Sequence, residues 1–521
     1  MTRRIWAFDT EDNSQGECTL INFFNGVEHF TFYGAHEREK AMAFLEAQDP
    51  MILWGVNAEY DLINLFGPWL TKVCTLQYID AGLLRAFFSE GRVMVYDTLR
   101  HWALSVRAMG DLLHYAKLPR DSQSVSYCRR DTEITHRFVR IMLAQYQEQG
   151  LSLRPTLPGM AFQLFKSLYP YEPEPFPSMI KTLFREGYYG GRVEVYQTGK
   201  IHGPINHYDI NSLFPYVMRE SVFPRLDSWR RTDAPNFKRE GIVRARLSCP
   251  MTMYPCLPVR AKDEILYPYG ELVGVWTYPE IRQALKDGAK IQGVGEAIEF
   301  DSVCRPFISF VELCYNKRLA AESDFERLHY KLLMNSLYGK FGAKGALITI
   351  KDDRERVMHA SGNSANIIWS AYTTAYARLK LLALLRGCET VYYTDTDSVF
   401  TPREQPVSTD IGALKRVGVY TQAEFLGNKV YCVQRKPRGA WEGKARGVPK
   451  HQALDYIRTG KCVFSRPMRL RESRVSLVGQ PNIWYPMTKV HRRKYAKRNV
   501  QRDGSTLPWA MADYRRVVSE K

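Results

Sequence analysis

Three short motifs between residues 207 and 398 hold the side chains that most constrain how this 521-residue chain can fold. They read HYDINSLFP at residues 207–215, KLLMNSLYG at 331–339 and YTDTDS at 393–398. Asp209 is far in sequence from Asp395 and Asp397, so a fold that uses these acids together must pair distant segments. Converging carboxylates can hold divalent metal ions, and Lys331 adds a cation suited to phosphate groups.

The middle motif lies on a segment with strong helix signals. Ser323 and Glu326 fit a capping box, which predicts a helix that begins there and ends near Gly339. Lys331 and Asn335 are four residues apart, and Tyr338 follows three residues later, so all three share one face of that helix. A face with a cation, an amide and an aromatic ring indicates a binding surface rather than plain core.

The third motif is predicted to form the tip of a hairpin, at residues 394–397, after a helix over residues 367–386. Asp395 and Asp397 are two residues apart, and an extended backbone would place both side chains on the same side. Paired acids repel each other strongly unless a cation neutralises them. A lone motif of this kind is more often an exposed acidic turn. Together with the Asp209 motif and the helical motif, it indicates nucleotidyl transfer.

Residues 1–150 carry a second set of acids on a predicted α/β unit, with strands at 4–8 and 51–54 and a helix that runs from 132 through 143. Its motifs are DTE at 9–11, NAEYD at 57–61 and YCRRD at 127–131. Four carboxylates, Asp9, Glu11, Asp61 and Asp131, are enough for a two-metal hydrolytic site. Each acid alone is better explained as a cap or a surface charge, and only the ordered set favours a site. Lys117 is a weaker candidate for the same site, because no tight motif surrounds it.

Positive charge is concentrated at the end of the chain. The net charge is +18, and residues 429–521 hold 23 Lys and Arg against 6 Asp and Glu. A basic segment on a nearly neutral body is typical of a module that follows a phosphate backbone. A solvated charged face would give the same composition. Lys429, Lys444 and residues 492–494 are the first candidates for phosphate contacts.

Cysteine spacing and hydropathy further limit the classes of protein to which the chain can belong. The ten cysteines form no C-x-x-C pair, which argues against a zinc or iron–sulfur module and fits a reducing compartment. No apolar run reaches the length of a membrane span, and no signal sequence is recognisable near residue 1. We therefore expect a soluble, intracellular protein.

Taken together, the motifs resemble those of the family B DNA polymerases, and the resemblance covers nearly the whole chain. Residues 209–215 resemble the palm motif D-x-x-S-L-Y-P, residues 331–339 the fingers motif K-x-x-x-N-S-x-Y-G, and residues 395–398 the motif D-T-D-S. The resemblance implies that Asp209 and Asp397 are metal ligands and that Asp395 is a supporting catalytic acid. It also implies a nucleotide-binding set made of Phe214, Arg318, Lys331, Asn335 and Tyr338.

One position departs from the family pattern. The family usually has Tyr where this chain has Phe214, a ring that packs under the incoming sugar and blocks a 2′-hydroxyl by its bulk. Phenylalanine keeps the bulk and loses the hydrogen bond of the phenol. We expect selection for deoxynucleotides to be retained.

The N-terminal motifs resemble the three exonuclease motifs of the same family, D-x-E, N-x-x-[FY]-D and Y-x-x-x-D. The resemblance implies that Asp9, Glu11, Asp61 and Asp131 are catalytic acids and metal ligands. It implies that Tyr127 orients the attacking water. The frayed primer end would be held by Asn57, Tyr60, Thr98 and Leu99.

Within family B, the chain is most similar to the small polymerases of phages, adenoviruses and linear plasmids that start from a terminal protein. Residues 188–191 resemble their Y-x-G-G connection, where the backbone comes close to the template, and residues 429–431 resemble their K-x-Y motif, which steadies the primer terminus. The implied DNA contacts are Tyr188, Gly190, Gly191, Lys429, Tyr431 and Lys444. A simple glycine turn and an ordinary strand are the structural alternatives for these two motifs.

The resemblance implies a multidomain α/β and α+β fold, with an RNase H-like 3′–5′ exonuclease domain and a right-hand polymerase of palm, fingers and thumb. The expected order is exonuclease domain 1–150, proline-rich connection 151–187, palm with a terminal-protein insertion 188–310, fingers 311–345, continued palm with a short second insertion 346–428, and basic thumb and C-terminal region 429–521. The prolines of the connection are expected to break regular structure. Residues 346–350 and 356–359 are expected to form a short hairpin in the second insertion.

The expected cofactor is Mg²⁺, two ions per active site, with Mn²⁺ also accepted. The expected partners are primer–template DNA, deoxynucleoside triphosphates and a terminal protein, with no membrane; an RNA primer or a nicked end stays open as the start. We expect replication of a viral or plasmid genome in the host cytoplasm, or in the organelle or nucleus that holds the replicon. Two alternatives remain: an exonuclease whose polymerase half is inactive, and a non-catalytic DNA-binding replication adaptor.

Overall fold

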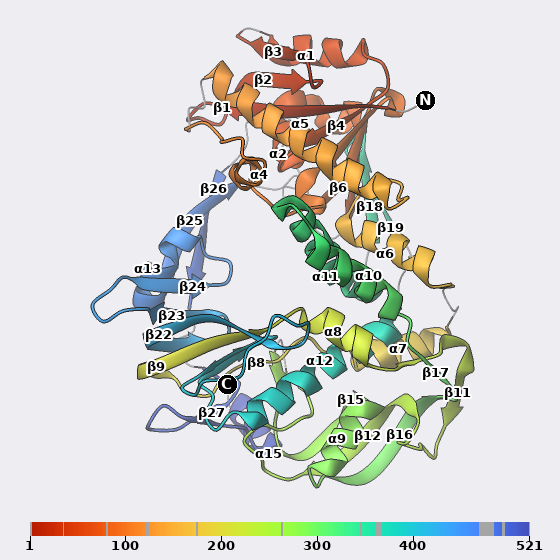
Figure 1. Ribbon diagram of the computed structural model, residues 1–521, viewed down its shortest axis with the longest axis vertical. Helices are drawn as coiled ribbons and strands as arrows, with labels where there is room; N and C mark the ends of the chain where they lie inside the picture. Colours follow the sequence, from red (N-terminus) through yellow and green to blue (C-terminus); the bar gives the residue numbers. More distant parts are fainter. Residues whose placement is uncertain are drawn as a thin grey trace. The chain divides into compact units, whose positions relative to one another are not determined.

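The computed structural model describes residues 3–34, 36–79, 82–119, 124–172, 176–261, 264–343, 346–359, 366–467, 484–491 and 495–519 (Figure 1). Its contacts divide the chain into two compact units, each built from segments that are distant in sequence. The first unit comprises Met1–Pro170, Leu313–Ala365 and Ser465–Met487, and the second comprises Tyr171–Glu312, Asn366–Phe464 and Thr488–Lys521.

The first unit is built on a mixed sheet that, over the described residues, has nine strands in the order β19-β18-β5-β6-β7-β4-β1-β2-β3. The strands are β1 (Arg4–Asp12), β2 (Cys18–Phe24), β3 (His29–Tyr33), β4 (Met51–Gly55), β5 (Cys74–Ile79), β6 (Gly82–Phe88), β7 (Val93–Asp97), β18 (Ala346–Lys351) and β19 (Arg354–His359). The pairs β1–β4 and β4–β7 are parallel. The expected strands at 4–8 and 51–54 are confirmed, and β1 continues through its acidic motif.

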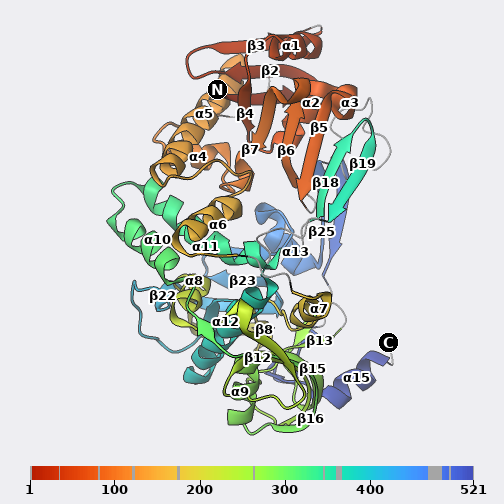
Figure 2. The ribbon, with the colours of Figure 1, turned by 90° about the vertical axis from the view of Figure 1, so that its right-hand side faces the viewer.

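The hairpin of β18 and β19 confirms the expectation for the second insertion. It also extends the sheet of the N-terminal segment, because β18 pairs with β5 from Leu347 to Ile350 (Figure 2). Asp352 N donates a hydrogen bond of 2.7 Å to Thr71 O at the turn of this hairpin. Residues more than 250 positions apart in sequence thus share one sheet.

The helices of this unit are α1 (Glu37–Glu46), α2 (Ala58–Phe66), α3 (Leu70–Val73), α4 (Val106–Leu112), α5 (Val125–Glu148), α6 (Leu157–Leu168) and α11 (Asp324–Gly342). Helix α5 packs against β1 and β2 through a buried face (Figure 1). This helix confirms the one expected from residue 132 onward, and it begins at Val125.

Two expectations about helices were wrong. Residues 151–187 hold α6 and also α7 (Ser178–Glu186), where we expected proline to break regular structure. Pro158 lies in the first turn of α6 and Pro177 immediately precedes α7, positions where a missing N–H costs nothing. The helix of the middle motif begins after Ser323 as expected, but it continues past Gly339 to Gly342.

The second unit is built on an antiparallel sheet that, as far as the chain is described, has seven strands in the order β24-β23-β22-β9-β21-β20-β8. The strands are β8 (Val193–Val195), β9 (Gly199–Ile210), β20 (Tyr393–Asp395), β21 (Ser398–Thr401), β22 (Leu414–Gly427), β23 (Val430–Gln434) and β24 (Trp441–Ala445). The expected hairpin is confirmed, because β20 and β21 pair with Asp395 opposite Ser398.

Helices α8 (Leu213–Glu220) and α12 (Ile367–Gly387) pack on one face of this sheet. Leu381 and Leu385 of α12 contact the apolar side of β9 and Val217 of α8 in one buried cluster. The helix expected over residues 367–386 is therefore confirmed to within one residue. A second buried cluster, separate from the first, includes Tyr393, Phe425 and Tyr431 of the sheet strands.

The remaining elements belong to the second unit or lie where the chain passes from one unit to the other in sequence. A further sheet contains β11 (Trp229–Thr232), β16 (Lys290–Phe300), β12 (Glu240–Cys249) and β15 (Gly270–Thr277), with α9 (Tyr278–Lys286) beside it. The other elements are β10 (Phe223–Pro224), β13 (Val259–Ala261), β14 (Glu264–Leu266), β17 (Val303–Cys304), α10 (Ile308–Ala320), α13 (Ala453–Thr459), β25 (Lys461–Pro467), β26 (Trp484–Val490), β27 (Asn499–Val500), β28 (Thr506–Leu507) and α15 (Met511–Ser519). Among the described residues, no helix combines the length and the apolar character needed to cross a membrane.

Candidate active sites

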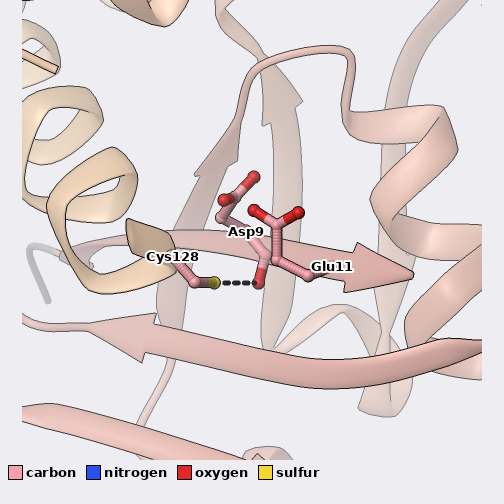
Figure 3. A group of neighbouring side chains, drawn as sticks. All are labelled: Asp9, Glu11 and Cys128. Carbon is pink, nitrogen blue, oxygen red and sulfur yellow. Dashed lines mark hydrogen bonds between the residues drawn. The ribbon is translucent and has the colours of Figure 1, made fainter. Parts of the chain in front are cut away.

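The first acid cluster lies in the first unit, where β1 meets the start of α5. Strand β1 carries Asp9 and Glu11, and α5 brings Cys128 to them (Figure 3). One ligand atom of each of these three residues lies within 4.8 Å of the others. The Cys128 thiol donates to Asp9 O at 3.6 Å, which ties the helix to the strand. The cysteine was not expected here, because the motif Y-x-x-x-D does not specify that position.

Asp61 on α2 and Asp131 on α5 complete the predicted set of four acids. Both are buried, with 3% and 4% of their surface exposed. Thr10 Oγ1 donates a hydrogen bond of 2.8 Å to Asp61 Oδ1. Asp9 Oδ2, Asp61 Oδ2 and Asp131 Oδ1 are buried and find no hydrogen-bond donor among the described residues. Such orphaned acceptors are costly unless a cation satisfies them.

The electrostatics of the cluster lead to the same conclusion. Burial, reinforced by Asp131, raises the pKa of Asp9 to about 7. Burial, reinforced by Asp9, raises the pKa of Glu11 to about 9. The pKa of Asp61 is also raised well above its usual value by burial and by Asp9. Acids that are this crowded hold protons in the absence of metal, and a divalent cation would convert them to carboxylates. The residues therefore fit a divalent metal.

Lys117 is the cation that the structure adds to this cluster. Its ammonium forms an ion pair with Asp131 Oδ2 and lies 4.5 Å from the centroid of the Tyr127 ring. The sequence supported Lys117 only weakly, because it reaches the site from an irregular segment with no motif of its own. Its position next to both predicted residues makes it part of the site.

The residues expected to hold a frayed strand lie at the ends of nearby elements. Asn57 caps α2 with a φ of 65°, and its N donates to Asp97 Oδ1 at 3.1 Å. The same oxygen accepts from Leu99 N at 2.9 Å, and the Tyr60 hydroxyl donates to Asp12. Leu99 is exposed, whereas the side chain of Thr98 is fully buried. Of these two side chains only that of Leu99 is exposed, and the expected contact of both residues with the strand end stays a prediction.

The second acid cluster lies on the seven-stranded sheet, in a row that runs across neighbouring strands. Asp395 faces Ser398, Ser398 faces Asp209, and Asp209 faces Lys415 in the registers of β20, β21, β9 and β22. Residues that face each other in antiparallel strands project on the same side of a sheet. Ile210 N donates to Asp397 O at 2.7 Å, which fixes the turn against β9 directly after Asp209.

The turn itself differs from the expected extended backbone. Thr396 has a φ of 63°, and Asp397 N donates to Asp395 O at 2.7 Å, so the chain reverses tightly between the two acids. A β-branched residue rarely adopts a positive φ, and such strain persists only where the surroundings hold it. The two acids therefore have different environments and different partners.

Each acid of this cluster except Asp397 has its own cation. Lys415 Nζ lies 2.6 Å from Asp209 Oδ2, and Lys429 Nζ lies 2.6 Å from Asp395 Oδ1. Burial, then Asp209 and Asp395, raise the pKa of Asp397 to about 6. Asp397 forms no ion pair within the described part of the chain. A third negative charge beside two neutralised acids fits the binding of a divalent cation.

Gly191 allows the backbone to come close to the turn at residues 395–397. A Cβ at this position would lie 2.7 Å from Thr396 Cγ2, and Thr396 N donates to Arg192 O at 2.8 Å. Arg378 Nη1 donates to Tyr189 O at 2.6 Å and to Gly190 O at 3.1 Å, which fixes the preceding residues. Gly191 thus accommodates a close approach of the protein's own turn, and the expected approach to the template stays a prediction.

The K-x-Y motif divides into one residue at the site and one in the core. Lys429 N donates to the Tyr393 hydroxyl at 2.9 Å, and its ammonium holds Asp395. Tyr431 is only 6% exposed, and its ring packs 5.3 Å from that of Tyr393. The Tyr431 side chain is thus buried here, and its expected contact with DNA stays a prediction. Lys444 lies over the outer side of the Tyr431 ring, 5.6 Å from its centroid.

The structure places each residue of the nucleotide-binding prediction but does not show whether all of them converge. Phe214 lies in the first turn of α8, five residues after Asp209, and packs half-buried against the cluster under the sheet. Lys331 is exposed on α11, with Asn335 and Tyr338 half-buried on the same helix, and Arg318 is half-buried on α10. These four residues belong to the first unit, so their convergence on Phe214 stays a prediction. Residues 492–494, expected to contact phosphates, lie outside the described residues.

Sequence reasoning missed Lys415, the cation that neutralises Asp209, and it predicted Lys429 only as a DNA contact. Lys415 belongs to no motif, and only its register opposite Asp209 brings it to the site. A lysine on a strand with alternating exposure resembles any surface lysine. No signal in the sequence could have distinguished it.

The fold is of the class in which a right-hand polymerase of palm, fingers and thumb occurs in one chain with an exonuclease domain. The structure of Phi29 DNA polymerase with primer–template DNA has this fold, with a TM-score of 0.75 at 15% identity, over 94% of this chain and all of that one. The ternary complex of the same polymerase gives a TM-score of 0.74.

The sequence comparisons find a similar family and similar proteins. The family described as DNA polymerase type B, organellar and viral, matches residues 120–374. A DNA-directed DNA polymerase of Enterobacteria phage PRD1 is 22% identical over 466 residues, which cover 80% of this chain and 81% of that protein. A probable DNA polymerase of Neurospora intermedia is 26% identical over 365 residues, 59% of this chain but only 37% of the fungal protein. The chain is therefore similar to family B DNA polymerases, with the family match over residues 120–374.

Proposed function

We propose that this chain is a DNA-directed DNA polymerase with a 3′–5′ proofreading exonuclease that replicates a viral or plasmid genome. The observation that carries the proposal is the presence of two separate acid clusters, one in each unit. Each has a buried or crowded carboxylate oxygen or carboxylate with no hydrogen-bond donor or ion-pair partner among the described residues. One cluster lies on the palm sheet and the other on the exonuclease sheet. Separate centres allow one enzyme to extend a strand and to trim it.

At the palm, Asp209 and Asp397 would hold the metal. Two magnesium ions, replaceable by manganese, would supply activation of the primer 3′-hydroxyl and stabilisation of the leaving pyrophosphate. Asp395, fixed by Lys429, would keep the turn in place without binding metal directly. Phe214 would lie under the incoming sugar and exclude a 2′-hydroxyl by bulk. The triphosphate would be bound by the fingers residues Arg318, Lys331, Asn335 and Tyr338.

At the exonuclease cluster, Asp9, Glu11, Asp61 and Asp131 would hold the metal. Tyr127 would orient the attacking water, and Lys117 would neutralise one oxygen of Asp131 while leaving the other free for the cation. The exposed Leu99 would contact the unpaired strand end, with Asn57 and Tyr60 nearby.

The substrates proposed are primer–template DNA and deoxynucleoside triphosphates. Both Phi29 DNA polymerase complexes hold primer–template DNA, and one of them also holds incoming nucleotide substrates. The excess of basic residues from 429 onward supports a DNA-binding surface. If about five phosphates are neutralised, the logarithm of duplex affinity should fall with that of salt concentration with a slope near −4.5. A slope near zero would contradict the proposed surface.

Primer extension and strand degradation, measured on the same preparations, test the proposal. Asp397→Asn should abolish extension and leave degradation of single-stranded DNA intact. The double change of Asp9→Ala and Glu11→Ala should have the opposite effect. A wild-type protein that degrades but does not extend would be an exonuclease with an inactive polymerase half. One that does neither but binds DNA would be a replication adaptor.

We propose further that synthesis starts from a terminal protein, inside the host compartment that holds the replicon. The support is the similarity of residues 188–191 and 429–431 to motifs of protein-primed polymerases and the hairpin of β18 and β19 at the second insertion. Labelling of candidate partner proteins with a deoxynucleotide, beside extension of a plain DNA primer, tests this part. Extension of the primer with no labelled protein would support the polymerase activity and contradict initiation from a terminal protein.

A further inference from the structure

The chain's C-terminal segment folds back onto β8, the edge strand of the palm sheet. Val195 N donates to the Tyr495 hydroxyl at 3.0 Å, and Thr506 Oγ1 donates to Val195 O at 2.8 Å. Thr506 N donates to Tyr196 O at 2.9 Å. Strand β8 therefore has β20 on one side and residues from 300 positions later on the other. A three-residue strand held on both sides depends on both partners for its position.

Three charged residues are buried where the C-terminal segment meets β8. Glu194 is fully buried between Arg192, which is 1% exposed, and Arg498, which is 0% exposed. Arg192 Nε donates to Glu194 Oε2 at 2.6 Å, and Arg498 Nη1 lies 3.5 Å from Glu194 Oε1. The Tyr196 hydroxyl donates to Glu194 Oε2 at 3.0 Å. Burying charges is costly, and such clusters persist where they fix one arrangement.

Arg498 uses the geometry of its guanidinium as well as its charge. Its Nε donates to Thr506 Oγ1 at 2.9 Å, and its Nη2 donates to Met253 O at 3.1 Å. The guanidinium carbon lies 4.7 Å from the centroid of the Tyr196 ring. Lysine has neither the planar fork nor these several fixed donors, so it could not reproduce the set.

The buried cluster connects directly to the catalytic turn. Val193 of β8 pairs with Asp395 of β20, and Arg192 O accepts the hydrogen bond from Thr396 N. Arg192 is thus bound through its side chain to Glu194 and through its backbone to the turn. Any movement of β8 would be transmitted to Asp395 and Thr396.

We propose that Arg498 is a positioning residue of the polymerase centre, and that the segment from Tyr495 to Thr506 is a strap that holds β8 and, through it, the turn at residues 395–397. This inference rests on the proposed polymerase activity. It reverses the sequence-based expectation for this part of the basic C-terminal region. Arg498 serves the palm from within and does not face DNA phosphates.

Arg498→Met is the primary test, because it leaves Glu194 paired with Arg192 and so creates no uncompensated buried charge. We expect kcat for single-nucleotide extension to fall roughly 10–100-fold, as for a displaced reacting group, with KM for the nucleotide within about threefold. Degradation of single-stranded DNA, which the other unit performs, should stay near the wild-type rate. Arg498→Lys should restore little of the lost kcat. Arg502→Met is the matched control, because Arg502 is exposed on the same segment.

Thr506→Val is a second variant that tests the same proposal if Arg498→Met does not fold. It removes the hydroxyl that accepts from Arg498 and donates to Val195 while keeping the side-chain shape. A lower kcat with an unchanged unfolding temperature supports the strap. Wild-type kcat in a folded Arg498→Met or Thr506→Val protein overturns it. So does a loss confined to DNA affinity with a shallower salt dependence, which would make Arg498 a phosphate contact. Failure of the wild-type protein to extend a primer would instead overturn the proposed function.

Discussion

Gly191 provides a sharp test of how the palm acids are positioned, because its neighbour Gly190 is a matched control. A Cβ at residue 191 would lie 2.7 Å from Thr396 Cγ2 and 2.9 Å from Thr396 Oγ1. Ordinary contacts begin at about 3.4 Å, so Thr396 would have to move by about 0.7 Å. A Cβ at residue 190 would have Ile265 Cδ1 as its nearest neighbour, at 4.0 Å. The two alanine variants therefore differ in one contact.

The displacement can be converted into a rate. Misplacing a reacting group by about 1 Å costs up to about 100-fold, so a shift of about 0.7 Å at Thr396 should cost roughly 10–100-fold in kcat, or about 1.4–2.8 kcal/mol of activation free energy. Gly190→Ala should remain within about threefold of wild type. The assay is single-turnover addition of one deoxynucleotide to a primed template, with degradation of single-stranded DNA as the internal reference.

A second change separates the contact from a general disturbance. Thr396→Ser removes Cγ2, the atom closest to the new Cβ. The double variant with Gly191→Ala should therefore lose less activity relative to Thr396→Ser alone than Gly191→Ala loses relative to wild type. Equal extension rates for the 190 and 191 alanine variants would refute the reasoning, because the turn would then tolerate the added carbon.

Three other expectations follow from the charged groups. Lys429→Met leaves Asp395, 7% exposed, without its cation and should lower the free energy of unfolding by about 1–3 kcal/mol in denaturant titrations; unchanged stability would mean that the ion pair contributes nothing. Lys117→Met should slow degradation roughly 10–100-fold and leave extension unchanged, because it removes the partner that orients Asp131; an equal fall in both activities would contradict a role in one centre. The raised pKa of Asp9, about 7 against an unfolded value of about 4, means that the folded state keeps a proton that the unfolded state releases. Metal-free protein should therefore lose stability as pH rises from about 4 to 7, manganese should restore it, and Asp9→Asn should flatten the curve; a thermal melting temperature independent of pH in the wild type would count against this cluster.

Local sequence signals predicted much of the site because they depend on short-range physics. The Ser323 cap, the hairpin around Asp395 and the strand that carries Asp9 follow from periodicity and from hydrogen bonds between near neighbours. The same signals failed where the position of a residue within its element determines its effect, as for the prolines in residues 151–187. Proline disrupts the interior of a helix, and only the position of each helix start showed that these prolines fall outside it.

The sequence by itself determined which acids are present, their order, and the elements that bear them. Only the tertiary structure decided which cation neutralises each acid, and that the lysine of the K-x-Y motif faces the site whereas its tyrosine is buried. It also decided that Arg498 is buried beneath the palm rather than exposed to DNA. The reason is physical. A motif reports interactions within one turn or one hairpin. The pairing of Asp209 with Lys415, or of Glu194 with Arg498, instead depends on strand register and on packing between segments hundreds of residues apart.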